Sequence, residues 1–134
     1  MLKTVIAAFV LLSCSGAFAL VSNDSDLVQA IHQDQNVNFI EAGNMVVTQI
    51  LPDDTVGLPH QRWMVRLSDN STMALIYNSD MGDRVPLQIG ETVAAGGQLI
   101  MGEQGPLLHW LHADPKGRRP DGYIYANGVY YGGK

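Results

Sequence analysis

Cysteine is almost absent from this chain, which has a single one, Cys14, in 134 residues. Cys14 lies in an N-terminal segment that we expect to be removed, so the mature chain would have none. A mature chain without cysteine excludes disulfide bonds, a thiolate nucleophile and cysteine-ligated zinc. A packed core alone must then hold the fold together.

Long hydrophobic runs are also lacking. The apolar stretch Thr4–Leu12 is well short of the ~20 residues that span a bilayer. It follows Lys3 and precedes Ala17-Phe18-Ala19, which together give the positive start, apolar core and A-x-A site of a secretory signal peptide. We therefore expect residues 1–19 to be removed after Ala19, leaving a periplasmic or secreted protein without a transmembrane segment.

An alternative N-terminus is a lipid-anchored one. Leu12-Ser13-Cys14 resembles a lipoprotein cleavage box, which would leave a lipidated Cys14 as the first residue. Leu12 is larger than that box prefers, and the A-x-A site downstream is intact. The soluble form is therefore the main prediction and the lipoprotein form the alternative.

Positive charge is scarce. Eight Lys and Arg stand against thirteen Asp and Glu, for a net charge of −5. This balance opposes nucleic-acid binding, because neutralisation of phosphates supplies most of the non-specific affinity. It leaves room for a local basic patch, and Lys116, Arg118 and Arg119 form one.

Helical periodicity is confined to residues 22–34, where cap-type residues precede apolar residues at helical spacing. The rest of the chain favours strands. Gln61–Ser68 and Thr72–Asn78 alternate cleanly between apolar and polar residues, and Asn127-Gly128 between two β-prone arms predicts a hairpin. Further strands are expected at 45–51, 92–101 and 107–114, with a turn at 52–55, a bulge or bend at Gly96-Gly97, and loop over 79–91.

The pattern predicts a mainly β fold. Residues 20–134 are expected to form a single domain, a small five-stranded barrel of the oligonucleotide/oligosaccharide-binding (OB) type. One N-terminal helix and a C-terminal hairpin complete it.

The stretch HWLHADPKGRRPDG, residues 109–122, contains two of the four histidines of the chain. On a straight strand, His112, Asp114 and Trp110 share one face, and His109 shares the other with Leu107 and Leu111. His109 then fits a buried, hydrogen-bonded structural residue, whereas His112 and Asp114 fit a ligand site, an oriented general base or a polar rim. His60 reaches the same region if the strand ends meet at one barrel mouth.

Metal binding and catalysis have weaker support. His109, His112 and Asp114 are the candidate metal ligands, but joint chelation needs the strand to bend, so a divalent metal is not favoured and the cofactor is unknown. The catalytic candidates are His60, His112, Asp114 and Arg84. The mature chain has no cysteine nucleophile, G-x-S-x-G sequence or phosphate-binding glycine loop. Cations beside Trp110 and Tyr123 provide what single-stranded nucleic acid would need, although the net negative charge disfavours that partner.

Several of these residues resemble the bacterial family catalogued as domain of unknown function 3465. The similarity runs from about residue 45 to the end of the hairpin and rests on these positions: Asp53-Asp54-Thr55, His60-Gln61, Asn78, Asp80, Arg84, His109-Trp110, His112, Asp114-Pro115, Gly117 and Gly122. The resemblance implies a signal peptide and supplies no reaction. This chain has Tyr77 and Ala113 where the family pattern has histidine, and Leu99–Gly102 replaces an aromatic-acidic stretch, which argues against a histidine metal site.

Three functions remain open at this stage, and the chain is not assigned as an enzyme. The first is an exported binding module for a small or oligomeric ligand, with Trp110, His112, Asp114, His60, Asn78 and Arg118 as its surface. The second is a small phosphodiesterase or nuclease with a histidine base. The third is a structural envelope protein whose polar cluster only locks loops.

Overall fold

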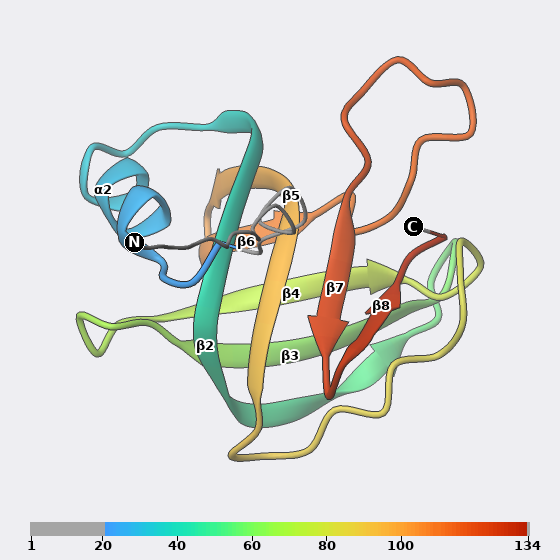
Figure 1. Cartoon of the computed structure of the whole chain (residues 1–134), viewed down its shortest axis with the longest axis horizontal. Coiled ribbons are helices and arrows are strands. Elements are labelled where there is room, and N and C mark those ends of the chain that lie inside the picture. Colours follow the sequence, from blue (N-terminus) through green and yellow to red (C-terminus); the bar gives the residue numbers. More distant parts are fainter. Residues whose placement is uncertain (1–20, 134) are drawn as a thin grey trace, which may run out of the picture.

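The computed structural model describes residues 21–133. The segment expected to be a signal peptide, with Cys14 and the Ala19 site, lies outside them. The described part is mainly β, as predicted, with one short helix and seven strands in one sheet (Figure 1). No helix in residues 21–133 is long and apolar enough to cross a membrane.

Seven strands and the helix follow one another along the chain. The elements are α2 (Ser25–His32), β2 (Val37–Asp54), β3 (His60–Arg66), β4 (Thr72–Asn78), β5 (Thr92–Gly102), β6 (Gly105–His109), β7 (Tyr123–Ala126) and β8 (Val129–Tyr131). No helix or strand forms between residues 79 and 91, as predicted from the proline and glycines there.

Five of the strands form a closed ring of neighbours. The order is β2-β3-β4-β6-β5, and β5 pairs again with β2. All contacts in the ring are antiparallel except β4–β6, where Ala74 and Leu75 pair in parallel with Leu107 and Leu108. The hairpin β7–β8 is added to β5 beyond the ring.

Strand β2 is far longer than the predicted segment 45–51, and it takes part in both sides of the ring. It pairs with β5 up to Val46 and with β3 from Val46 onward, with irregular register on both sides. Asn44 has a positive φ of 58° at one irregularity, where an Asn tolerates the left-handed conformation. The turn expected at 52–55 is therefore misplaced, because β2 continues to Asp54 before the chain turns.

Of the bulge or bend expected at Gly96-Gly97, the bulge is not formed. Ile40, Glu41 and Ala42 pair in regular register with Gly97, Gly96 and Ala95. The two glycines instead permit close packing. A Cβ on Gly97 would lie 2.3 Å from the His109 carbonyl oxygen, and one on Gly96 would lie 2.6 Å from the Tyr123 ring.

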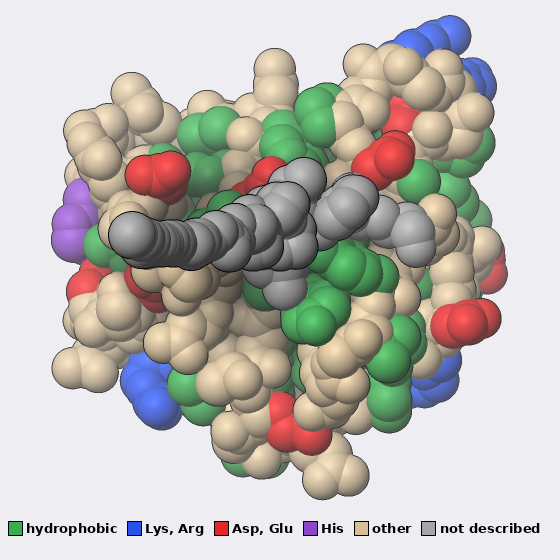
Figure 2. All heavy atoms as spheres, viewed as in Figure 1, with side chains coloured by type: hydrophobic (Ala, Val, Ile, Leu, Met, Phe, Trp, Pro, Cys, Tyr) green, Lys and Arg blue, Asp and Glu red, His purple; other side chains and the backbone are tan. Residues whose placement is uncertain are grey.

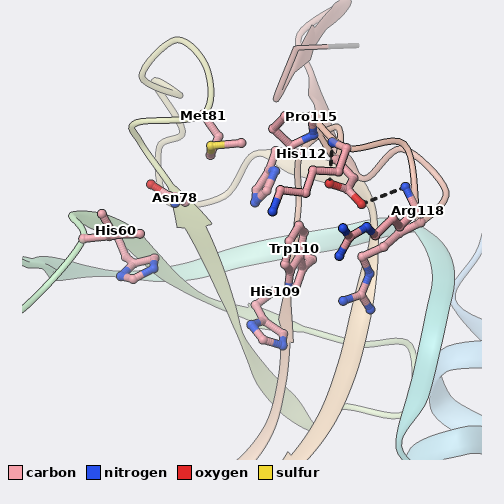
Figure 3. A pocket seen from close by; sticks show the side chains of 12 residues that line it. His60, Asn78, Met81, His109, Trp110, His112, Pro115 and Arg118 are labelled. Atoms are coloured by element: carbon pink, nitrogen blue, oxygen red, sulfur yellow. Dashed lines mark hydrogen bonds between the residues drawn. The ribbon is translucent and has the colours of Figure 1, made fainter.

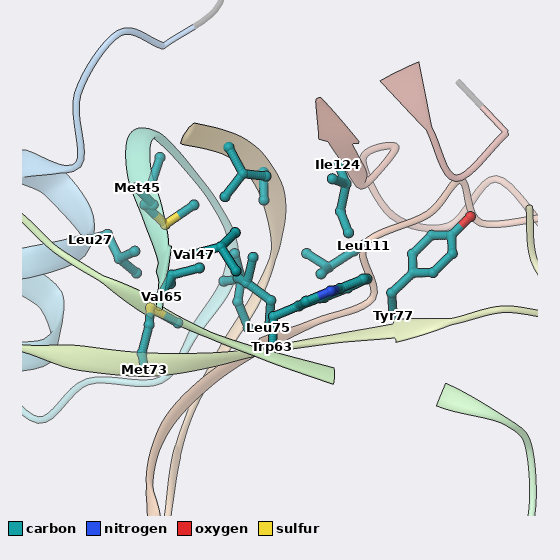
Figure 4. Packing of buried hydrophobic residues seen from close by; sticks show 14 of the residues in the cluster. Leu27, Met45, Val47, Trp63, Val65, Met73, Leu75, Tyr77, Leu111 and Ile124 are labelled. Carbon is teal, nitrogen blue, oxygen red and sulfur yellow. The ribbon is translucent and has the colours of Figure 1, made fainter. Parts of the chain in front are cut away.

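The alternating strands β3 and β4 contribute their apolar residues to the core, as predicted. Trp63 and Val65 are buried from β3, and Met73, Leu75 and Tyr77 from β4 (Figure 4), while Leu67 is buried just after the end of β3. Such apolar side chains interdigitate inside the ring, and their removal from water is the main favourable term in folding.

Two buried polar side chains fasten loops to this core. Gln61 binds the backbone of Val85 with both ends of its amide, at 3.0 and 2.8 Å, and so holds the loop 79–91 against β3. Asp24, at the start of α2, accepts the backbone N–H and hydroxyl of Ser68 at 2.7 and 2.6 Å. The helix, shorter than the predicted 22–34, is thereby fixed to the β3–β4 turn.

Candidate functional site

A cavity of about 720 Å³ opens where β3 begins, β4 ends and β6 leads into the loop 110–122 (Figure 3). Its volume lies in the range of small-molecule sites. Its lining residues are Leu58, His60, Asn78, Met81, His109, Trp110, His112, Asp114, Pro115, Lys116, Arg118 and Arg119. The structure thus brings together all six predicted ligand-binding residues, which come from three separate segments of the chain.

The chain leaves β6 at His109, so the predicted strand 107–114 is wrong in its second half. Trp110 has a φ of 59°, a left-handed conformation that costs a non-glycine residue about 1–2 kcal/mol. The backbone after it is held from both sides, since Gly122 N–H donates to His112 O at 3.0 Å and Ala113 N–H donates to Gly132 O at 2.8 Å. The strand-face argument for His112 and Asp114 therefore does not apply.

His112 is the most enclosed of the pocket residues, with 7% of its surface exposed. Its Nδ1 lies 2.8 Å from the carbonyl oxygen of Ala113. A carbonyl can only accept, so Nδ1 carries the proton and Nε2 of the neutral ring is left as an acceptor. The ring also packs against Trp110, with centroids 4.9 Å apart.

His60 and His109 each bury a ring nitrogen without a hydrogen-bond partner, Nδ1 in His60 and Nε2 in His109. The predicted hydrogen-bonded role of His109 is thus wrong for this nitrogen. Burial lowers the pKa of His109, and the charges of Arg119, His60 and His112 lower it further. Buried polar atoms without a hydrogen-bond partner are uncommon in folded proteins, so these two atoms mark the cavity as a candidate site.

Asp114 organises the loop that carries the basic residues. Its two carboxylate oxygens accept the backbone N–H groups of Lys116 and Arg118 at 2.9 and 3.0 Å. The hydrogen bond from Lys116 is the largest cause of the lowered pKa of Asp114, with that from Arg118 adding to it. Asp114 is therefore a charged loop-fixing residue, and no hydrogen bond joins it to His112 among the described residues.

Three cationic side chains, those of Lys116, Arg118 and Arg119, line the cavity. The guanidinium of Arg119 lies 4.7 Å from the centroid of the Trp110 ring, which is a cation–π arrangement. Within residues 21–133 the ion pairs are His32–Asp69 and Arg84–Asp53, so Lys116, Arg118 and Arg119 are not neutralised by a paired carboxylate. Figure 2 shows basic side chains at the upper right, where Figure 1 places this loop.

A metal site is not assembled from the predicted ligands. Residues 21–133 contain no group of three or more His, Asp, Glu or Cys placed to hold one ion. His109, His112 and Asp114 all line the cavity, but the Asp114 carboxylate already accepts the two backbone N–H groups described above.

Two other predicted residues lie away from the cavity. Arg84 does not line it and instead pairs with Asp53, with Nη1 to Oδ2 at 2.8 Å. Tyr123 is unsuitable as a stacking surface, because it is 3% exposed and its hydroxyl donates to Glu41 at 2.9 Å.

The sequence did not single out the apolar part of the lining. Leu58, 58% exposed, and Met81 come from loops that carry no periodic pattern. The sequence shows only a leucine next to Pro59-His60, and the exposure of that leucine is seen in the structure alone.

Fold and site together define a small, mainly β protein with a basic and aromatic pocket at one end of its ring of strands. The family model described as protein of unknown function (DUF3465) matches residues 9–132, so the chain belongs to that family, as the resemblance predicted. No curated protein and no solved structure matches the chain.

Proposed function

We propose that the chain is a small exported binding module whose ligand carries negative charge and binds in the cavity around Trp110. The observation that carries this proposal is the set of cations Lys116, Arg118 and Arg119 at the cavity, against the single carboxylate of Asp114. Arginine presents a planar fork of donors that matches carboxylate and phosphate oxygens. A net negative protein that concentrates unpaired cations at one aromatic cavity has a local preference for anions.

The strand order supports an OB-type barrel for residues 20–134. A ring β2-β3-β4-β6-β5 with one parallel contact, β4–β6, and a return to β2 is compatible with a partly open five-stranded Greek-key barrel. Fold does not fix function, so the argument for binding rests on the cavity.

Export is proposed from residues 1–19 alone. The full chain expressed in a Gram-negative host should yield a periplasmic protein that begins at Leu20. A mature N-terminus at a lipidated Cys14 would contradict the soluble form and support the lipid-anchored form.

The binding proposal can be tested through the intrinsic fluorescence of Trp110. The other tryptophan, Trp63, is 1% exposed in the core and serves as an internal reference. Phenyl phosphate should change the emission on titration, and benzylamine, which carries a ring and the opposite charge, should not. Arg118→Gln should weaken phenyl phosphate binding about tenfold, the value of a charge-assisted hydrogen bond.

Arg66→Gln is the matched control. Arg66 is exposed at the other end of β3 and lines neither this cavity nor its neighbours. It should bind phenyl phosphate as the wild type does. Equal binding of the two probes, or equal loss in the two arginine variants, would remove the basic cavity as an anion site.

A hydrolase is the second candidate, and the fixed tautomer of His112 favours it. With Nδ1 committed to Ala113, Nε2 is available as a general base toward the cavity. His60 and Asp114 also line the cavity, whereas Arg84 does not. Turnover of bis(4-nitrophenyl) phosphate that is lost in His112→Gln and kept in His32→Gln would support this candidate over simple binding.

A further inference from the structure

A second hollow adjoins the basic cavity and extends it along the sheet. It has a volume of about 760 Å³ and covers the outer face of β3, β4 and β6. His60 and His109 line both hollows, so the two hollows meet at these histidines. Figure 3 shows His60 and His109 below the basic loop, on the side toward these strands.

The floor of the second hollow is an apolar trough. Ala74 on β4 lies between its register partners, Met64 on β3 and Leu107 on β6, so a small side chain is flanked by two large ones. Ile76 follows Ala74 two residues along, on the same face of β4 and toward the histidines. These four side chains are half-buried and line the second hollow.

The charges of the second hollow differ in sign from those of the first. Asp54 and Glu103 line it, with Arg62 as the one Lys or Arg. The Arg62 guanidinium donates two hydrogen bonds to the Pro52 carbonyl oxygen at 3.0 and 2.8 Å and keeps its charge, so two carboxylates face one guanidinium here. A chain of many negative charges would be attracted at the loop and repelled along the sheet, whereas a neutral tail would not be repelled.

We propose that the ligand is a free single-chain amphiphile, with one anionic head group in the basic cavity and its alkyl tail in the trough over Ala74. The proposal rests on the proposed function and specifies its ligand class. The juxtaposition that carries it is a basic cavity that shares His60 and His109 with a hollow whose floor is apolar. β6 from Gly105 to His109 gives the trough a length of about 13 Å at about 3.3 Å per residue.

The test is a chain-length series of alkyl carboxylates, from butanoate through octanoate to dodecanoate, below their micellar concentrations. Each methylene that reaches the trough should tighten binding about two- to fourfold, because a fully buried methylene contributes about 0.8 kcal/mol and this one is covered on one side. Octanoate should therefore bind at least about tenfold more tightly than butanoate. Dodecyltrimethylammonium, with the opposite head charge, should not bind.

Ala74→Leu fills the trough and should abolish the gain with chain length. The variant should still bind phenyl phosphate as the wild type does, which shows that it is folded and that its basic cavity is intact. Ile76→Thr, a second variant that keeps a β-branched side chain, should reduce the gain per methylene. Val46→Leu adds a methylene on a half-buried strand position outside both hollows and should change nothing.

The possible failures separate the two proposals. If phenyl phosphate binds but affinity is independent of alkyl length, the amphiphile is overturned and the anion site stands. If neither class of anion binds, both proposals fall. Tighter binding of an octathymidylate, or binding only to vesicles of anionic phospholipid, would likewise overturn a free single-chain ligand, in favour of a polyanion or a membrane surface.

Discussion

Two histidine nitrogens at the cavity lack the partners that buried polar groups normally have, and His109 shows what this implies for a single residue. The Nε2 atom of His109 is buried and unpaired. Burying an unpaired polar group costs desolvation free energy. A shape-matched apolar side chain at this position would remove that cost without breaking a hydrogen bond of Nε2.

We predict that His109→Leu changes the free energy of unfolding at pH 7.5 by less than about 1 kcal/mol and makes it less sensitive to acid. The pKa of His109 in the folded protein lies below its ordinary value of 6.5. The unfolded chain therefore binds the proton more readily, and the wild type loses stability as the pH falls below about 6.5 toward the folded pKa. Urea unfolding at pH 7.5 and 5.0 checks this, and a variant as sensitive to acid as the wild type would contradict it.

Trp110 is a second single residue of interest, because its backbone conformation is strained. A non-glycine residue at positive φ is costly, and such strain persists where the surroundings fix it, often at ligand sites. Here the left-handed turn ends β6 and sets the Trp110 ring beneath Arg119 and against His112. No periodic pattern in residues 107–114 indicates it, because alternation continues across the break.

At the scale of elements, glycines allow the backbone around the site to come close together. A Cβ on Gly122 would lie 1.9 Å from the Trp110 carbonyl oxygen and 2.8 Å from the His112 nitrogen. Both neighbours are backbone atoms, which cannot rotate away. Gly122 is thus required where β7 approaches the segment that presents Trp110 and His112.

We expect Gly122→Ala to destabilise the protein by about 3 kcal/mol, the upper range for overpacking, and to weaken phenyl phosphate binding. Gly117→Ala is the control in the same loop. It has a φ of +65° and nothing within 4 Å of its Cβ position, so it should lose only about 1 kcal/mol and keep its affinity. Thermal unfolding reports the stability of both variants, and fluorescence titration reports their affinity for phenyl phosphate. Equal effects of the two substitutions would contradict a packing role for Gly122.

The same elements show what the sequence could and could not predict. β3, β4 and the Asn127-Gly128 hairpin were predictable because their alternation and turn residues are local, and both turn residues have positive φ. The first half of β2 was missed because its polar residues, such as Asn38 and Glu41, hide the pairing with β5. That pairing, like the parallel contact β4–β6, is a long-range property.

The residues of the candidate site also divide into those that the sequence could indicate and those that it could not. His60 and His112 were singled out as chemistry-bearing residues, and the strand ends bring them to one cavity. Arg84 was assigned there because residue type alone does not show that it pairs with Asp53. The trough over Ala74 could not be predicted, because it depends on the register of three strands.

The whole molecule has two distinct ends. The β3–β4 hairpin runs between them, with its turn beside α2 and its open end at the cavity (Figure 1). At the turn, Asp24 binds Ser68 and His32 pairs with Asp69 at 2.9 Å. Leu27 anchors the helix in the core with none of its surface exposed.

This separation predicts that stability and binding can be changed independently. Leu27→Ala should lower the free energy of unfolding by about 3 kcal/mol, as expected for a large-to-small change in a core, while its affinity for phenyl phosphate at 15 °C stays that of the wild type. Arg118→Gln should do the reverse, losing about tenfold in affinity with a stability change under about 0.5 kcal/mol. Urea unfolding and titration of the same two preparations test both halves. Leu27 does not line the cavity, so a loss of affinity in folded Leu27→Ala would mean that the helix end and the cavity are coupled through the ring.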